Sequence, residues 1–328
     1  MTAEIAPVRP ESPGTFIRQR RLSLGDPLLG WSVRILSWAA LAAIVLMLLD
    51  TAGHSLKLLE HTSILDFVFG ILWQPASTVY GALPFIYGTL VTSALALILA
   101  VPLALGAALL VNEYLPRPVA SPIAYAIELL AAVPSVVYGF WGILVLVPAL
   151  RPFEQAVAGS ALGQIPIFAG PVPGPSYLAA GVILAIMILP IVTSVARDAM
   201  RATPRLQREG ALALGATHWE TIRHVVLPFA RGGIFAGVIL GLSRAIGETI
   251  AVLFVIGNQP QVNASIFAPG YSLPSVIAGE FAEANQPFHP EALIALGVVL
   301  FLLSFAVNVA ARAVVARFEA RAGGADVR

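Results

Sequence analysis

The sequence predicts an all-α integral membrane protein with six transmembrane helices. Hydrophobic residues make up 58% of the 328 residues and charged residues only 11%, against roughly 25% charged residues in soluble domains. The mean hydropathy is +0.86. A helix that crosses a bilayer needs about 20 mostly apolar residues. Runs of this length or close to it lie at 35–52, 85–111, 122–150, 177–196, 232–256 and 292–311.

The first 34 residues are polar and basic, and are too long and too charged for the start of a cleaved signal peptide. We therefore expect the run at 35–52 to be a retained membrane anchor. The predicted organisation is a cytoplasmic basic segment (1–34), a first span with an external loop (35–84), a five-span core (85–316) and a cytoplasmic tail (317–328). A cytoplasmic loop at 197–231 interrupts the core.

The second span is uncharged and carries a small residue at every fourth position: Gly88, Thr92, Ala96, Ala100, Ala104 and Ala108. Such a stripe lets a neighbouring helix approach closely, which favours helix association in lipid. The third span contains Glu128 and Pro134. The stretch 151–176 after it is rich in proline and glycine, which favours an extended loop over a helix.

Arginine and lysine are distributed unevenly between the two sides of these spans. Sixteen of the nineteen fall in the N-terminal segment, at Arg117, in 197–231 or from Arg312 onward. The other side holds Lys57 and Arg151, and Arg244 lies within the fifth span. Basic residues concentrate on the cytoplasmic side of membrane proteins. We therefore expect both termini and the 197–231 loop to face the cytoplasm.

A polar, amphipathic helical segment at 209–228 lies between two spans. Trp219, Ile222 and Val226 fall on one helical face, and Gly215 interrupts the pattern where the chain could turn. Pro228 is expected to end the segment, because proline lacks the N–H that a helix interior requires. This pattern indicates either an interfacial helix or a surface that docks a partner.

Arg244 and Glu248 are one helical turn apart within the fifth span. A charge there costs on the order of 3 kcal/mol, so it persists mainly where it meets a cavity, a partner charge or a substrate. One reading is a structural ion pair of Arg244 with Glu248 or Glu128. The other is that Arg244 offers planar donors to an oxyanion in transit, with Glu248 orienting it. Near the kink expected at Pro134, Ser135 and Tyr138 either present hydroxyls to that path or satisfy the kinked backbone.

Two sets of motifs resemble known transporter families. The run EGA at 209–211, Gly215 and VVLP at 225–228 resembles the EAA loop of binding-protein-dependent ABC importer permeases. Gly210 and Val225 depart from its usual form. Sequences at 73–75 (WQP), 80–90 (YGALPFIYGTL), 133–142 (VPSVVYGFWG) and 241–249 (GLSRAIGET) look like the C-type permease of phosphate-specific (Pst) ABC importers, over residues 30–318.

The resemblance implies a type I ABC importer permease (MetI-like) fold in a bacterial inner membrane. It implies partners: a second, related permease (PstA-like), two cytoplasmic ATPases (PstB-like) that bind ATP and Mg²⁺, and an extracytoplasmic phosphate-binding protein (PstS-like). It places Arg244 and Glu248 on the phosphate path. Glu128, Ser135 and Tyr138 are further candidates for that path because of their positions in the third span, not because of the resemblance. The residues implied to contact the ATPase are Glu209, Gly210, Ala211, Gly215, Thr217, Trp219, Leu227 and Pro228.

The chain lacks the motifs of an enzyme. A phosphate-binding P-loop needs Gly-x4-Gly-Lys-Ser/Thr, and the single lysine, Lys57, lies in SLKL. We therefore expect ATP hydrolysis in a partner and no cofactor in this chain. Without cysteine and with scattered histidines, no metal site is predicted. A net charge of +1 says nothing about nucleic acid, and no nucleic-acid partner is expected.

The sequence alone leaves alternatives to a phosphate importer subunit open. Sulfate, molybdate or phosphonate could replace phosphate as the cargo. An ion-coupled secondary transporter would need coupling carboxylates, for which Glu128 and Glu248 are candidates. A membrane-embedded enzyme would need a convergent nucleophile or metal cluster, which the sequence does not indicate.

Overall fold

The computed structural model describes residues 25–323. The chain divides into two units, Met1–Leu49 and Asp50–Arg328. Helix α1, Gly25–Leu59, supplies the described part of the first unit and the start of the second. Most of the basic N-terminal segment and the last five residues lie outside the described residues.

Within residues 25–323, six helical segments are long and apolar enough to cross a membrane, which confirms the predicted number. They are Leu29–Leu58, Leu83–Tyr114, Ser135–Ala158, Tyr177–Arg201, His218–Ile246 and His289–Ala316. Most extend several residues beyond the expected bounds because polar end residues, which hydropathy excludes, continue the helix. Within the first unit, apolar side chains such as Trp31, Leu36 and Trp38 are exposed, as expected for a segment that lipid surrounds.

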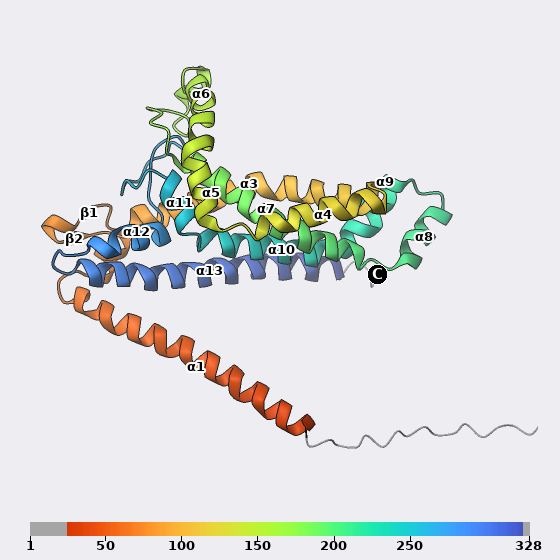
Figure 1. The fold of residues 1–328 in the computed structure, drawn as a ribbon, viewed down its shortest axis with the longest axis horizontal. Helices are drawn as coiled ribbons and strands as arrows, with labels where there is room; N and C mark the ends of the chain where they lie inside the picture. The colour runs from red at the N-terminus through yellow and green to blue at the C-terminus, as the bar shows by residue number, and fades with distance from the viewer. Residues whose placement is uncertain (1–24, 324–328) are drawn as a thin grey trace, which may run out of the picture. The chain divides into compact units, whose positions relative to one another are not determined.

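The core of the second unit is formed by α3 (Leu83–Leu109), α7 (Tyr177–Arg201) and α10 (Leu227–Ile246), which run side by side (Figure 1). The stripe of small residues on α3 is fully buried, as predicted for a face that packs closely on a neighbouring helix. A second stripe on α10 meets α7. A Cβ added at Gly237 would lie 3.1 Å from Cβ of Val195, and one at Gly241 would lie 2.8 Å from Cγ2 of Val192.

The third expected span is not one helix. The structure has α4 (Arg117–Ala131), a break, α5 (Ser135–Trp141), a π-turn η3 (Gly142–Leu146) and α6 (Val147–Ala158). Pro134 at the break removes an N–H donor and disfavours helical geometry for the residue before it. The expected continuation of the fifth span is also wrong, because α10 ends at Ile246 and a short helix, α11 (Ile250–Val255), follows.

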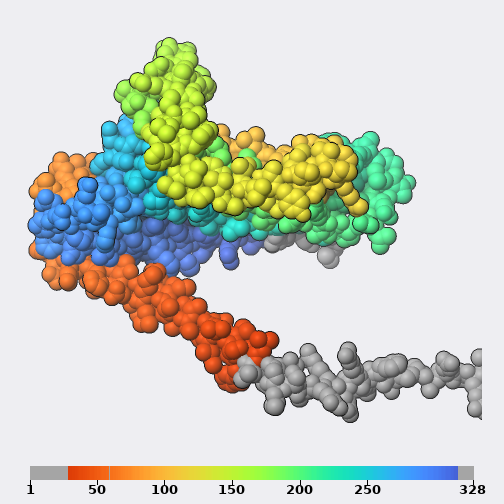
Figure 2. Space-filling view, viewed as in Figure 1, coloured from red at the N-terminus to blue at the C-terminus, as the bar shows by residue number. Residues whose placement is uncertain are grey.

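The expectation of an extended loop at 151–176 is wrong for its first part. Helix α6 continues to Ala158, and a 3₁₀ turn, η4, follows at Ala161–Gln164. The hydroxyl of Ser176 donates to Oε1 of the fully buried Glu154 at 3.0 Å, which anchors α6 to the start of α7. The part after Gln164 contains no helix up to Tyr177. Figure 2 shows α6 and this loop standing out from the rest of the second unit.

One end of the second unit carries α2 (Ile64–Phe69) and a two-stranded antiparallel hairpin, β1 (Trp73–Gln74) and β2 (Val79–Tyr80), joined by the 3₁₀ turn η1 (Pro75–Ser77). The hairpin packs on α12 (Leu273–Glu280) and α13 (His289–Gly323). The 3₁₀ turn η6 (Phe281–Glu283) follows α12 directly.

Polar contacts fix the hairpin in place. Nε1 of Trp73 donates to Oε2 of Glu280 at 2.9 Å, and the hydroxyl of Tyr80 donates to the carbonyl of Pro287 at 2.6 Å. Burial and the nearby Glu291 carboxylate raise the pKa of Tyr80, so this hydroxyl stays protonated as a donor.

The opposite end of the second unit carries α8 (Arg205–Ala213) and α9 (His218–Thr221) (Figure 1). Gly215, with a φ of +91°, makes the turn between them, as expected from its position. The expectation that Pro228 ends the helix is wrong. A π-turn, η5 (Ile222–Val226), connects α9 directly to α10, with Pro228 in the first turn of α10. The widened turn accommodates a residue without an N–H.

Candidate functional site

Arg244 and Glu248 form an ion pair where α10 ends. Arg244 lies in the last turn of α10, and Glu248 follows in the short break before α11. Nη2 of Arg244 is 3.2 Å from Oε2 of Glu248, while Oε1 of Glu248 accepts a weak hydrogen bond from the backbone N–H of Ala251 at 3.3 Å. The break therefore holds the carboxylate in one position.

The two partners of this pair differ in exposure. The Glu248 side chain is 3% exposed, whereas the Arg244 side chain is 48% exposed. A guanidinium has five N–H donors, and the contact with Glu248 occupies one edge of it. Arg244 therefore keeps donors available on an open face of this subunit, next to a fixed negative charge.

Glu128 does not pair with Arg244. Its Oε1 accepts a hydrogen bond from Nη2 of Arg197 at 2.6 Å, which joins α4 to α7. Of the two carboxylates considered as partners for Arg244, the structure places only Glu248 beside it.

The helix that begins after Pro134 contacts the same region. A Cβ added at Gly139 of α5 would lie 3.0 Å from Cα of Ala251 on α11, so these two short helices pack closely. Tyr138 is buried, and its hydroxyl donates to the carbonyl of Leu130 across the break at 2.8 Å. Pro134 has no N–H to donate to this carbonyl, which also accepts a longer hydrogen bond from the N–H of Val133 at 3.3 Å. Ser135 is half-buried in the first turn of α5.

The α8–α9 segment (residues 205–221) presents a largely exposed surface. Glu209 and Gly210 are exposed, and Ala211 is half-buried. Leu206, Leu214 and Trp219 are 82%, 92% and 52% exposed, although large apolar side chains usually avoid water. Thr217 caps α9: its hydroxyl accepts from the N–H of Glu220, and the Glu220 carboxylate accepts from the N–H of Thr217.

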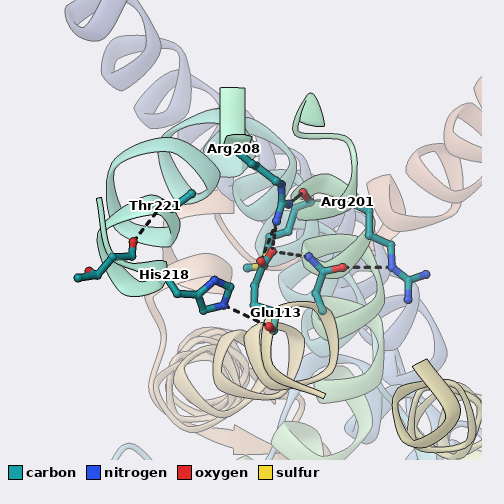
Figure 3. A network of polar contacts seen from close by, with 8 residues as sticks. Glu113, Arg201, Arg208, His218 and Thr221 are labelled. Carbon is teal, nitrogen blue, oxygen red and sulfur yellow. Dashed lines mark hydrogen bonds and ion pairs between the residues drawn. The ribbon is translucent and has the colours of Figure 1, made fainter. Parts of the chain in front are cut away.

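A polar network around the buried Glu113 side chain fastens this segment to the rest of the second unit (Figure 3). Nη1 of Arg208 on α8 donates to both carboxylate oxygens of Glu113, at 2.9 and 2.7 Å, and Nη2 donates to the carbonyl of Met200 at 2.6 Å. A ring nitrogen of His218 lies 3.2 Å from the Glu113 carbonyl oxygen. Glu113 belongs to the π-turn η2 (Leu110–Tyr114), which continues α3.

Sequence reasoning did not identify this network. A signal was present, because Glu113 is the first charged residue after the long uncharged run of α3, and such an isolated carboxylate next to a span needs a partner. The sequence does not tell which of the arginines in 197–231 supplies it.

Leu227 and Pro228 lie where the α8–α9 segment joins the transmembrane part of α10. Residues His218–Ile246 form one uninterrupted helical segment. The exposed surface at α9 and the Arg244–Glu248 pair are therefore at opposite ends of the same helix, about 40 Å apart at 1.5 Å per residue.

Comparisons with known proteins agree with the motifs. The model of the family described as binding-protein-dependent transport system inner membrane component matches residues 100–320. The phosphate transport system permease protein PstC of Mesorhizobium japonicum is 42% identical, over 93% of this chain and 94% of the relative. The protein of the same name from Xylella fastidiosa is 37% identical, over 98% and 100%.

A solved structure shares the fold. A chain in the crystal structure of a bacterial ABC transporter involved in the import of the acidic polysaccharide alginate superimposes with a TM-score of 0.57 at 16% identity, over 89% of this chain and 99% of that chain. The predicted fold class is confirmed. This multi-pass membrane protein belongs to the family of binding-protein-dependent transport system inner membrane components, with the PstC phosphate transport permeases among its relatives.

Proposed function

We propose that this chain is the membrane-spanning permease subunit of an ATP-driven importer of inorganic phosphate, and that Arg244 contacts the anion as it passes. The observation that carries the proposal is the half-exposed side chain of Arg244, whose guanidinium lies beside a buried carboxylate. Guanidinium donors match the acceptor oxygens of phosphate. Glu248 would orient Arg244 and, being negative itself, would limit how tightly the anion is held.

The open face of Arg244 fits a path that this subunit lines on one side only. A second, related permease subunit would supply the other side. A binding protein would deliver phosphate from outside the cell. Glu128, held by Arg197, would shape the path only through α4 and α7, and Tyr138 would support the backbone at the break.

ATP would act through the α8–α9 segment. Two partner ATPases would bind ATP and Mg²⁺ and dock on the exposed surface that includes Glu209, Leu214 and Trp219. Because α9 continues into α10, a displacement of α9 would be carried along one helix to Arg244. Binding of ATP to one conformation in preference to the other would then switch the path from inward-facing to outward-facing.

The orientation that this mechanism needs is the one that the arginine distribution favours. Both termini and the α8–α9 segment would lie in the cytoplasm. The hairpin end would lie on the extracytoplasmic side of the inner membrane. This chain would contribute no ATPase site of its own.

The test is phosphate uptake by an Arg244→Gln variant in a strain that lacks the native permease. We expect uptake to fall to background while the variant still assembles with its partner subunits at normal levels. Arg151→Gln, which removes an exposed arginine on α6, is the matched control and should transport normally. Loss of assembly in Arg244→Gln would contradict the proposed contact and make the ion pair structural.

Competition by sulfate and molybdate in the same assay identifies the anion. If either anion abolishes the uptake of labelled phosphate as well as unlabelled phosphate does, phosphate is not the specific cargo.

A further inference from the structure

A basic cavity lies beside the α8–α9 segment, at the end of the second unit remote from Arg244. It has a volume of about 480 Å³ and is lined by residues of η2, α4, α8 and the end of α7. Its polar lining consists of Asn112, Arg117, Arg201, Thr203, Arg205 and Arg208. Cavities that bind small ligands typically measure about 300–1,000 Å³.

The positive charge of this cavity is mostly uncompensated. Arg208 is neutralised by Glu113, and Nε of Arg201 donates to Oδ1 of the neutral Asn112 at 3.2 Å. Among the side chains that the structure describes, those of residues 29–58 and 60–316, no carboxylate lies within ion-pair distance of Arg117, Arg201 or Arg205. Three arginines from three different helices therefore line one space without a counter-charge. An anion in this space would offset their mutual repulsion.

The neighbouring surface extends the positive charge. A second cavity, of about 540 Å³, shares Arg117 and Arg201 with the first and is also lined by Arg197 and Glu128. The last two residues neutralise each other. Arg117 and Arg201 can therefore contact a ligand in either cavity, and the net charge of the residues that line the two cavities is positive.

A buried hydroxyl also lacks a partner here. Thr203 is 4% exposed and lines the first cavity, and its Oγ1 has no hydrogen-bond partner among the described residues. A buried hydroxyl normally forms a hydrogen bond, and one left without a partner costs about 1–3 kcal/mol. A bound acceptor oxygen would satisfy it.

We propose that this cavity binds a phosphate group, carried either by the headgroup of an anionic phospholipid or by inorganic phosphate. A phosphate presents several acceptor oxygens, to which planar guanidinium groups and a hydroxyl can donate together. Basic pockets between transmembrane helices on the cytoplasmic side are suited to anionic headgroups. None of the residues of this site takes part in the Arg244–Glu248 pair, so the site is additional to the transport path.

Occupancy would have a structural consequence for the α8–α9 segment. Arg117 belongs to the first turn of α4, Arg201 ends α7, and Arg205 begins α8. A phosphate group bound by all three would join these helices beside the Glu113–Arg208 contact and would fix the start of α8.

The test uses the full-length chain assembled with its partner subunits. One arm places the complex in nanodiscs of phosphatidylcholine with or without phosphatidylglycerol and counts retained lipids by native mass spectrometry. The other arm measures binding of radiolabelled phosphate by equilibrium dialysis in phosphatidylcholine alone. Both arms compare the wild type with Arg117→Gln/Arg205→Gln, with Thr203→Val, and with Arg231→Gln, which removes an arginine of α10 outside the cavity.

We expect phosphatidylglycerol retention or phosphate binding in the wild type and in Arg231→Gln. Binding should be about tenfold weaker for each arginine removed and more modestly weakened in Thr203→Val. Signal that Arg117→Gln/Arg205→Gln loses in the lipid arm identifies a headgroup in the cavity. Signal that it loses in the dialysis arm identifies free phosphate there, because the variant leaves Arg244 unchanged. The wild-type result alone can overturn the proposal, even if a variant fails to assemble. If the wild type retains no anionic lipid and binds no phosphate, the proposal is wrong. Equal binding by the double variant and Arg231→Gln would also overturn it.

Discussion

The carboxylate of Glu113 accepts two hydrogen bonds from Nη1 of Arg208, at 2.7 and 2.9 Å, although 95 residues separate the two in the chain. The Glu113 side chain is 3% exposed and the Arg208 side chain 23% exposed, so water screens this contact poorly. It joins η2, which continues α3, to α8 and so links the α8–α9 segment to the transmembrane helices.

Removing either partner of this contact should destabilise the protein strongly. Glu113→Gln leaves Arg208 without a counter-charge, and Arg208→Gln leaves a buried carboxylate. Loss of one partner of a buried ion pair costs on the order of 3 kcal/mol. In thermal unfolding of the purified complex, the double variant should lose clearly less than the sum of the two single losses. Strictly additive losses would mean that the two side chains do not interact.

Glu209→Lys should weaken the attachment of the ATPase subunits. Glu209 is exposed on α8 and makes no ion pair among the described residues, so the substitution leaves the fold intact and reverses one charge on the proposed docking surface. We expect reduced co-purification of the ATPase and reduced phosphate uptake. Glu283→Lys, the same change on an exposed residue of η6 at the hairpin end, is the control. Normal co-purification of Glu209→Lys would remove Glu209 from the docking surface.

Gly233→Ala should disturb the packing of α10 on α7. A Cβ added at Gly233 would overlap Cβ of Ala199, which cannot rotate away, so the helices must separate locally. We expect a lower midpoint of thermal unfolding. At Gly297 on α13 an added Cβ meets no atom within 4 Å, so Gly297→Ala should leave the midpoint unchanged or raise it through better helix propensity. Similar midpoints for the two variants would mean that α10 does not contact α7 through this glycine.

Tyr138→Phe separates the two roles considered for this hydroxyl. Because it donates to the Leu130 carbonyl across the break, its loss should lower stability by about 1 kcal/mol and leave the phosphate concentration for half-maximal uptake unchanged. Uptake kinetics and thermal unfolding of the same variant provide the two readouts. A raised half-maximal concentration with unchanged stability would instead place Tyr138 on the anion path.

The sequence predicted those parts of the fold that depend on periodic patterns. Ala96, Ala100, Ala104 and Ala108 recur at the spacing of one helical face, and all four are buried between α3 and α7. The number of spans was also predictable, because the length and hydropathy of a span are properties of one continuous stretch of sequence.

Helix breaks were harder to predict, because they depend on what surrounds each proline. Pro134 ends α4 and starts a new helix, whereas Pro228 lies in a helical segment that continues through it, since a π-turn precedes it. Ion pairs between residues far apart in the sequence could not be predicted either. The sequence offered Arg244 both Glu248 and Glu128, and only the packing of α4 on α7 places Glu128 against Arg197.

Under the proposed function, ATP hydrolysis in a partner subunit drives phosphate movement through this chain. The most direct measurement is uptake of radiolabelled phosphate into proteoliposomes that contain either the full complex or this chain alone, with and without ATP and with and without an imposed ion gradient. We expect phosphate to accumulate only with the full complex and ATP. Accumulation by this chain alone, driven by the ion gradient, would contradict the account.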